Sequence, residues 1–214
     1  MNTTSTAHPS AEIELMTRIR DKWGATIADA RKNAAIPEAF LAALVANETG
    51  GNADAKRFEH GVLAALWEVL QGRKAAYGSI GRDDLFNHIA LAVGTQPPLS
   101  ASGLVGRISN ALQFVDGLAT SWGLTQVMGY EAIVFGVSFA DLQNPVYGLR
   151  TSLRMLSQFA ERYQLDLGKD FSELLDCWNS GRPHSPTADP QYIPNGLLRM
   201  QIYQTLLPPK AMTA

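Results

Sequence analysis

Apolar residues recur every three to four positions along most of this chain, which is the spacing of amphipathic α-helices. The longest regular run lies in residues 146–163, where one stripe consists of Leu149, Leu153, Leu156 and Phe159. Shorter helices are predicted over residues 11–23 (with Ser10 as N-cap), 27–33, 36–48, 59–70, 83–93, 104–114, 170–178 and 194–206. Another helix is predicted to open in SWGLTQVMG, residues 121–129, and to be interrupted by Gly129. Alternating β-branched residues are few, so the predicted fold class is mostly α.

The helix predicted at 36–48 places a carboxylate on an apolar face. Pro37 suits the first helical position, where its missing N–H would have no partner in any case. The stripe that follows consists of Leu41, Leu44 and Val45, and the next position of the same stripe is Glu48. Gly50 and Gly51 come directly after it and predict the end of the helix.

Glu48 therefore belongs to the last helical turn, where unpaired backbone carbonyls concentrate negative charge. Apolar neighbours and that charge both disfavour an ionised carboxyl, so we expect its pKa to be raised. A carboxylic acid that stays protonated near neutral pH is suited to general acid catalysis. The alternative is an ordinary amphipathic helix whose terminal glutamate turns out to solvent.

Composition and charge limit the kinds of partner and of binding site that we expect in this protein. The chain has 214 residues, 46% hydrophobic and 18% charged, which suits one large domain or a domain with an insertion. A net charge of −2 gives no reason to expect nucleic acid as the partner. The single cysteine, Cys177, excludes a disulfide framework, and the four histidines are far apart in the sequence. We expect neither a metal site nor a cofactor.

The ends and breaks of the chain predict its organisation. Residues 1–10 and 208–214 are polar tails, and residues 11–207 are expected to form a single domain. Asn144-Pro145 marks a boundary, and segments 94–103 and 179–192 are loops rich in helix breakers. The N-terminus lacks a basic start followed by an apolar run, so we expect no signal peptide and synthesis in the cytoplasm. No stretch reaches the roughly 18 apolar residues that a membrane span needs.

Four short motifs occur in an order that is similar to one enzyme superfamily. ANETGGN (46–52) resembles the ESGGN-type motif of soluble lytic transglycosylases and goose-type lysozymes, and GLTQ (123–126) resembles their GLMQ motif. CWNSG (177–181) resembles their AYN-type motif, and QYIP (191–194) the segment that carries a tyrosine near the catalytic carboxyl. The resemblance covers residues 36–206 in patches and implies a lysozyme-like helical domain.

Two departures from the superfamily pattern place this chain closer to phage and bacterial muramidases of the endolysin kind. The stretch from Glu48 to Gly123 is longer than in ordinary lytic transglycosylases, which implies a helical insertion at about 58–119. RFEH (57–60) and TSWGLTQVMG (120–129) resemble strings of those muramidases, and the phage-encoded members lack a secretion signal. Thr49 and Thr125 replace the usual residues of their motifs without removing the acid.

The resemblance implies cleavage of the β-1,4 bond between N-acetylmuramic acid and N-acetylglucosamine, with Glu48 giving a proton to the leaving oxygen. A second carboxylate would hold or activate water, and Glu59 is the first candidate because it opens the helix after the Glu48 loop; Asp54 is the next. Lytic transglycosylases need no second carboxylate, since the same glutamate then acts as base on the sugar's own 6-hydroxyl. Hydrolysis and formation of a 1,6-anhydro product therefore both stay open.

The same motifs supply candidate contacts to the sugar, each with a structural alternative. Gln126 and Asn179 have amides that donate and accept hydrogen bonds, and Gly123 belongs to the motif that lines the groove. Tyr192 has a phenol suited to orienting Glu48. Trp122 and Trp178 are flat apolar rings that fit either a sugar platform or the core.

Peptidoglycan glycan strands are thus the expected partner, reached in the cell wall after delivery by another system; the oligomeric state is not predicted. One alternative is a non-catalytic peptidoglycan-binding protein, or a structural phage-particle protein, that keeps the fold without the activity. Another is a chitin-directed enzyme of the same superfamily.

Overall fold

The computed structural model describes residues 9–94 and 101–208 of the chain. Helices account for 66% and strands for 6% of it, which confirms the predicted mostly-α class. The chain divides into two compact units, one made of Met1–Ala53 and Pro145–Ala214 and the other of Asp54–Asn144. The second unit contains the stretch 58–119 that was expected to be an insertion. No helix in the described ranges combines the length and the apolar character needed to cross a bilayer.

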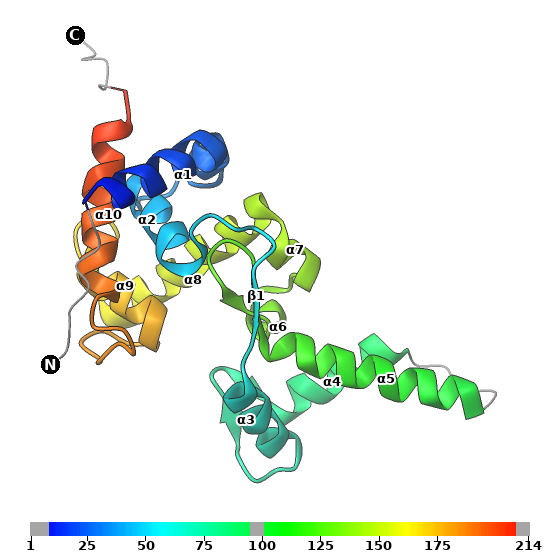
Figure 1. Cartoon of the computed structure of the whole chain (residues 1–214). Helices are drawn as coiled ribbons and strands as arrows, with labels where there is room; N and C mark the ends of the chain where they lie inside the picture. The colour runs from blue at the N-terminus through cyan, green and yellow to red at the C-terminus, as the bar shows by residue number, and fades with distance from the viewer. Residues whose placement is uncertain (1–8, 95–100, 209–214) are drawn as a thin grey trace, which may run out of the picture. The chain divides into compact units, whose positions relative to one another are not determined.

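In the described residues, the first unit contains the helices α1 Pro9–Ala30, α2 Glu38–Thr49, α8 Pro145–Tyr163, α9 Phe171–Ser180 and α10 Tyr192–Leu206 (Figure 1). α2 packs against both α1 and α10, and these two helices also contact each other. In addition, α1 contacts α8 and α10 contacts α9. The prediction of separate helices at 11–23 and 27–33 is wrong, because one continuous helix runs from Pro9 to Ala30. Ser10 therefore lies inside α1 and is not its N-cap. Of the predicted tails, residues 1–8 and 209–214 lie outside the described residues.

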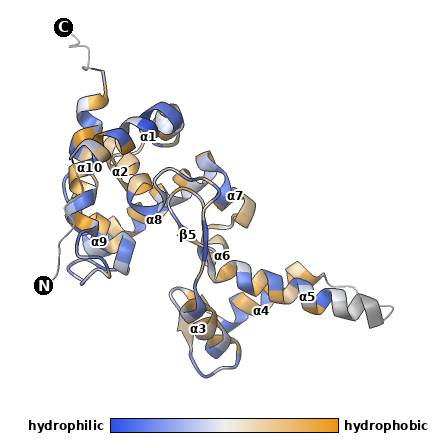
Figure 2. Cartoon of the chain, viewed as in Figure 1, coloured by the Kyte–Doolittle hydropathy of each residue, from blue (hydrophilic) through white to orange (hydrophobic). Residues whose placement is uncertain are grey.

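α2 is the core helix of this unit. Every residue from Ala39 to Ala46 is buried, so the predicted stripe of Leu41, Leu44 and Val45 is confirmed but is only part of a helix that is covered on all sides. Figure 2 shows apolar residues along α2 and a more polar α1. Pro37 lies one position before the first helical residue, with φ −65°, and Gly50 ends the helix in the left-handed conformation, with φ 60°.

α8 confirms the long helix predicted at 146–163. Leu149, Leu153 and Leu156 are buried, while Phe159 is half-buried. The helix begins at Pro145, where proline needs no hydrogen-bond partner for its nitrogen. The predicted boundary at Asn144-Pro145 is also where the two units of the chain meet in sequence.

The second unit combines short helices with two small sheets. Its elements are β1 Lys56–Phe58, α3 His60–Leu70, β2 Ala76–Tyr77, β3 Ile80–Gly81, α4 Arg82–Val93, α5 Ala101–Leu118, β4 Thr120–Trp122, β5 Val127–Met128, α6 Glu131–Phe135 and α7 Phe139–Gln143. The core of this unit forms where α3, α4 and the end of α5 meet, around Leu66, Val69, Leu85 and Leu118. The strand order β1-β4-β5 is antiparallel throughout.

The helix predicted to open at residues 121–129 is wrong, because this segment is the β4–β5 hairpin. Gly123 has φ +72° and Gln126 has φ +53°, and both values lie in the left-handed region that a continuing right-handed helix cannot contain. A Cβ on Gly123 would lie 2.5 Å from the carbonyl oxygen of Leu142, and one on Gly129 would lie 1.9 Å from that of Gly117. These two glycines therefore let neighbouring backbone pack directly on the hairpin.

Candidate functional site

Glu48 and Tyr192 are hydrogen-bonded to each other, although they lie 144 residues apart in the chain. Tyr192 is the first residue of α10 and donates its phenolic hydrogen to Oε1 of Glu48 in the last turn of α2. Tyr192 is 8% exposed and Glu48 is half-buried. The structure thus brings together two residues that sequence reasoning assigned to one site.

Tyr192 is a neutral donor at any physiological pH. Burial raises the pKa of its phenol, and the negative charge of Glu48 together with the hydrogen bond between them raises it further. A hydrogen bond to the carboxylate favours the ionised form of Glu48, whereas burial of that carboxyl favours the neutral form. Tyr192 therefore holds the carboxyl in one orientation and opposes the effect of its partial burial.

Asn47 fixes the start of α10 against the end of α2. Its Nδ2 donates to the carbonyl oxygen of Tyr192 over 2.9 Å, and its Oδ1 accepts from Nη1 of Arg199 over 2.8 Å. Gly196 allows this approach, because a Cβ there would lie 2.6 Å from the side chain of Leu175 and 3.1 Å from Nδ2 of Asn47. Both ends of the Asn47 amide thus serve to position Tyr192.

Arg199 connects this arrangement to α1. Its Nε and Nη2 donate to the two carboxylate oxygens of Glu12 over 2.7 and 2.9 Å, and the two side chains are only 15% and 6% exposed. A bidentate pair of this kind fixes geometry as well as charge. A continuous set of contacts therefore runs from Glu12 through Arg199 and Asn47 to Tyr192 and Glu48. Sequence reasoning missed Glu12, Asn47 and Arg199, and only Asn47 had a signal, as a member of the ANETGGN string.

Asn179 and Trp178 belong to the same unit but to another helix. Asn179 is exposed in the last turn of α9, and Trp178 beside it is half-buried. The turn that follows is held by Asp176, which is buried and accepts from the backbone N–H of Ser185 over 2.8 Å. A sugar-binding role for Asn179 and Trp178 stays a prediction.

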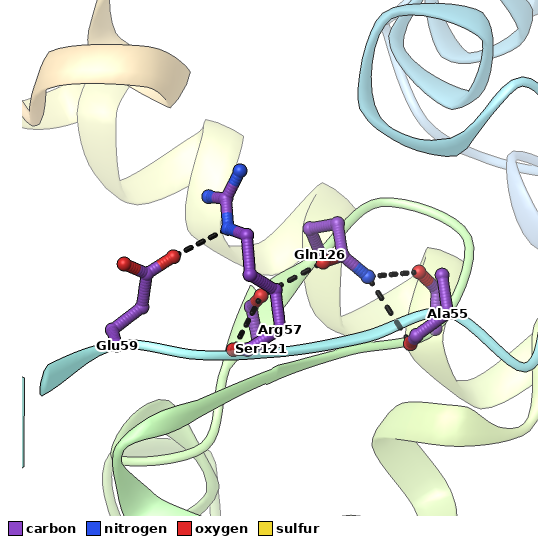
Figure 3. Close-up of polar contacts among 6 residues, drawn as sticks. Ala55, Arg57, Glu59, Ser121 and Gln126 are labelled. Atoms are coloured by element: carbon purple, nitrogen blue, oxygen red, sulfur yellow. Dashed lines mark hydrogen bonds and ion pairs between the residues drawn. The ribbon is translucent and has the colours of Figure 1, made fainter.

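The remaining predicted site residues, Glu59, Trp122, Gly123 and Gln126, lie in the second unit. Gln126 joins the β4–β5 turn to Ala55, the residue before β1 (Figure 3). Its Nε2 donates to the carbonyl oxygens of Gly123 and Ala55 over 3.0 and 3.2 Å, and its Oε1 accepts from the Ser121 hydroxyl over 2.8 Å. Both donor hydrogens of the amide are thus used within the protein. Gln126 lies in a turn and not on the surface of a helix, its amide has a structural role in its own unit, and its sugar-binding role stays a prediction.

Trp122 is similarly engaged by its own unit. Its Nε1 donates to the carbonyl oxygen of Gly117 over 3.0 Å, and its ring stacks on Phe139 with centroids 5.3 Å apart. Lys56 Nζ lies 4.7 Å from the centroid of the same ring. These contacts fix the orientation of the indole. A fixed ring is compatible with both roles considered for Trp122, a core residue and a sugar platform.

Glu59 is the N-cap residue of α3 and forms an ion pair with Nε of Arg57 (Figure 3). Its backbone N–H donates to the carbonyl oxygen of Ala119 over 2.9 Å. Asp54, the other candidate for a second carboxylate, accepts a long contact of 3.5 Å from Nε2 of Gln143. Catalytic roles for Glu59 and Asp54 stay predictions.

Among residues 9–94 and 101–208, no three His, Cys, Asp or Glu side chains gather in a way that would hold a metal ion.

Comparison with known proteins identifies no relative: no family model, no curated protein and no solved structure matches the chain. The geometry and chemistry of these side chains are therefore the basis for assigning a function.

Proposed function

We propose that this protein cleaves the β-1,4 glycosidic bond between N-acetylmuramic acid and N-acetylglucosamine in peptidoglycan. Glu48 is the general acid and Tyr192 is the residue that positions it. The observation that carries the proposal is the hydrogen bond from Tyr192 to Glu48, which joins two of the motifs singled out in the sequence. Asn47, Arg199 and Glu12 then act through Tyr192 rather than on the sugar.

The chemistry follows from the carboxyl group of Glu48. Tyr192 orients this group by its hydrogen bond to Oε1, and the protonated carboxyl supplies the proton. The leaving glycosidic oxygen takes this proton as the bond breaks and positive charge develops on the sugar ring. The ionised carboxylate that results is stabilised by the phenol of Tyr192, which prepares Glu48 to act as a base in the next step. That step deprotonates either a water or the 6-hydroxyl of the muramic acid residue.

The direct experiment is to measure solubilisation of purified cell walls by the Glu48→Gln variant. The amide keeps the size of the side chain but has no acidic proton, and loss of general acid catalysis lowers rates by roughly 10²- to 10⁴-fold. The matched control is Glu38→Gln, which makes the same change at the other end of α2. Wild-type activity in Glu48→Gln would overturn the proposal.

The products decide which reaction occurs. Hydrolysis adds one water across the bond, whereas attack by the 6-hydroxyl leaves an anhydro end that is one water lighter. Mass spectrometry of the released fragments separates the two outcomes in the same sample.

A second candidate is a non-catalytic peptidoglycan-binding or structural protein with the same fold. The observation in its favour is that Gln126 and Trp122, two predicted sugar contacts, make several hydrogen bonds and ring contacts within their own unit. Wall binding by the wild-type chain without release of fragments would support this candidate over the enzyme.

A further inference from the structure

A small pocket lies beside the loop that directly follows Glu48. It has a volume of about 190 Å³ and is lined by Arg18, Ile19, Lys22 and Trp23 of α1 and by Gly50 and Gly51 at the end of α2. We propose that this pocket binds a carboxylate of the peptide stem of peptidoglycan. The inference rests on the proposed function for the identity of the ligand, but its chemistry is set by the pocket itself.

Two positive charges on one side of α1 are the main feature of this pocket. Arg18 and Lys22 are exposed and lie four residues apart, and the six lining residues include no carboxylate. Glu14 lies one turn before Arg18, yet within the described residues neither Arg18 nor Lys22 forms an ion pair. Like charges at this spacing repel each other and destabilise a helix. A bound anion would remove that repulsion.

The aromatic part of the pocket wall is fixed in place. The indole Nε1 of Trp23 donates to the carbonyl oxygen of Gly51 over 2.9 Å, and Lys22 Nζ lies 4.9 Å from the centroid of the same ring. Gly51 has φ +91°, and a Cβ there would lie 3.4 Å from both Ile19 and Trp23. Glycine suits this backbone conformation, which other residues rarely adopt, and the indole ties α1 to the loop after Glu48.

The size and charge of the pocket select the ligand. A volume of about 190 Å³ is smaller than the roughly 300–1,000 Å³ of pockets for drug-sized ligands, so it suits one amino-acid residue and not a disaccharide. The end of α2 contributes about half a negative charge, which two full positive charges outweigh. A carboxylate next to an aliphatic or amide group matches the two cations and the indole that line the pocket.

The test is a binding titration of the full chain with N-acetylmuramyl tripeptide, a fragment with no bond for the enzyme to cut. We expect the Arg18→Gln/Lys22→Gln double variant to bind it at least tenfold more weakly than the wild type. We expect wild-type affinity to fall similarly when the carboxylates of the peptide are amidated. Lys32→Gln is the matched control, because it removes a positive charge from the same unit outside the pocket. Thermal unfolding confirms that the variants are folded.

Three results would overturn the inference. Equal affinity of the wild type for the free and the amidated peptide would show that the protein does not recognise a carboxylate. Equal affinity of the wild type and the double variant for the free peptide would show that the peptide binds outside this pocket. Competition by inorganic phosphate at the same concentration as the peptide would show a general anion site. Failure of the proposed function is a separate result, since it would appear as full wall solubilisation by Glu48→Gln and would leave this titration unchanged.

Discussion

Tyr203 donates a hydrogen bond of 2.9 Å to Oε1 of Glu38, so the helix pair α2 and α10 is joined by a tyrosine and a glutamate at each end. Tyr203 is fully buried, and burial, followed by the hydrogen bond to Glu38, raises the pKa of its phenol. The pair of Tyr192 and Glu48 has the same chemistry at the other end. The protein thus contains an internal control for the role of a tyrosine–glutamate pair.

We predict that Tyr192→Phe and Tyr203→Phe have similar effects on stability and different effects on catalysis. Each removes one hydrogen bond to a carboxylate, which stabilises a protein by about 1.5–3 kcal/mol. Only Tyr192→Phe should lower kcat on cell walls, by roughly tenfold or more, because only it leaves Glu48 unoriented. Denaturant unfolding measures the first effect and wall solubilisation the second.

The pH profile adds a signature that a purely structural tyrosine would not give. Loss of the Tyr192 donor disfavours ionised Glu48, so Tyr192→Phe should move the alkaline limb of activity to higher pH, whereas Tyr203→Phe should leave it in place.

A pocket of about 520 Å³ lies at the Glu38 end of α2 and is lined in part by Glu38, Arg31 and Gln204. Loss of activity in Glu38→Gln, with Glu48→Gln active, would move the catalytic site to that pocket.

The ion pair of Arg199 and Glu12 should be the most costly of these contacts to break from one side. Arg199→Met leaves the Glu12 carboxylate buried without its partner, and changes of this kind cost about 3–5 kcal/mol. Replacing both residues, as Glu12→Leu/Arg199→Met, should recover most of that loss, because no charge is then buried alone. Unfolding in urea compares the three chains.

The same two variants also test the positioning role of Arg199. With both residues replaced, stability should return while kcat stays low, since Asn47 still lacks the donor that fixes its amide. Full recovery of kcat in the double variant would contradict this role and would make the ion pair purely structural.

Gln126→Ala should destabilise the second unit. The amide makes two hydrogen bonds within the hairpin and one to Ala55 just before β1, and a net loss of about 0.5–1.5 kcal/mol for each is expected. If Gln126 is structural, thermal unfolding shifts to lower temperature and KM for soluble glycan fragments is unchanged well below that transition. A raised KM with normal stability would instead support the sugar-binding role.

The spacing of apolar residues along the sequence predicted the helices in which one regular apolar stripe is buried. α8 has an uninterrupted stripe, and α2 has both a stripe and a glycine stop, so each was located to within one or two residues. The burial of every residue from Ala39 to Ala46 in α2 was not predictable, because it depends on α1 and α10 covering the remaining faces of the helix. A repeat of 3.6 residues indicates one buried face and not burial on all sides.

The β4–β5 hairpin and the site network depend on contacts between distant residues. The hairpin strands have three and two residues, which is too short for a visible alternation, and Gln126 holds the turn to Ala55, 71 residues away. The pair of Glu48 and Tyr192 was expected only from motif resemblance. Arg199 and Glu12 are 187 residues apart, and neither has a local signal.

Cys177 should be unreactive in the folded protein at pH 8. The thiol is fully buried in α9, and burial, followed by the nearby charges of Asp176 and Glu173, raises its pKa from 9.0 to about 11. Ellman's reagent should therefore modify it only after denaturant is added. Fast modification of the native chain would show that this part of α9 opens readily.

The same pKa shift predicts how stability changes in alkali. A pKa that is higher in the folded state means that the folded chain holds its proton more tightly, so this contribution is complete below pH 9 and is lost as pH rises toward 11. The slope for one such group is at most about 1.4 kcal/mol per pH unit. Cys177→Ala removes the group, so its unfolding free energy should fall less steeply than that of the wild type between pH 9 and 11. Parallel curves for the two chains would contradict the shift, because the buried tyrosines contribute equally to both.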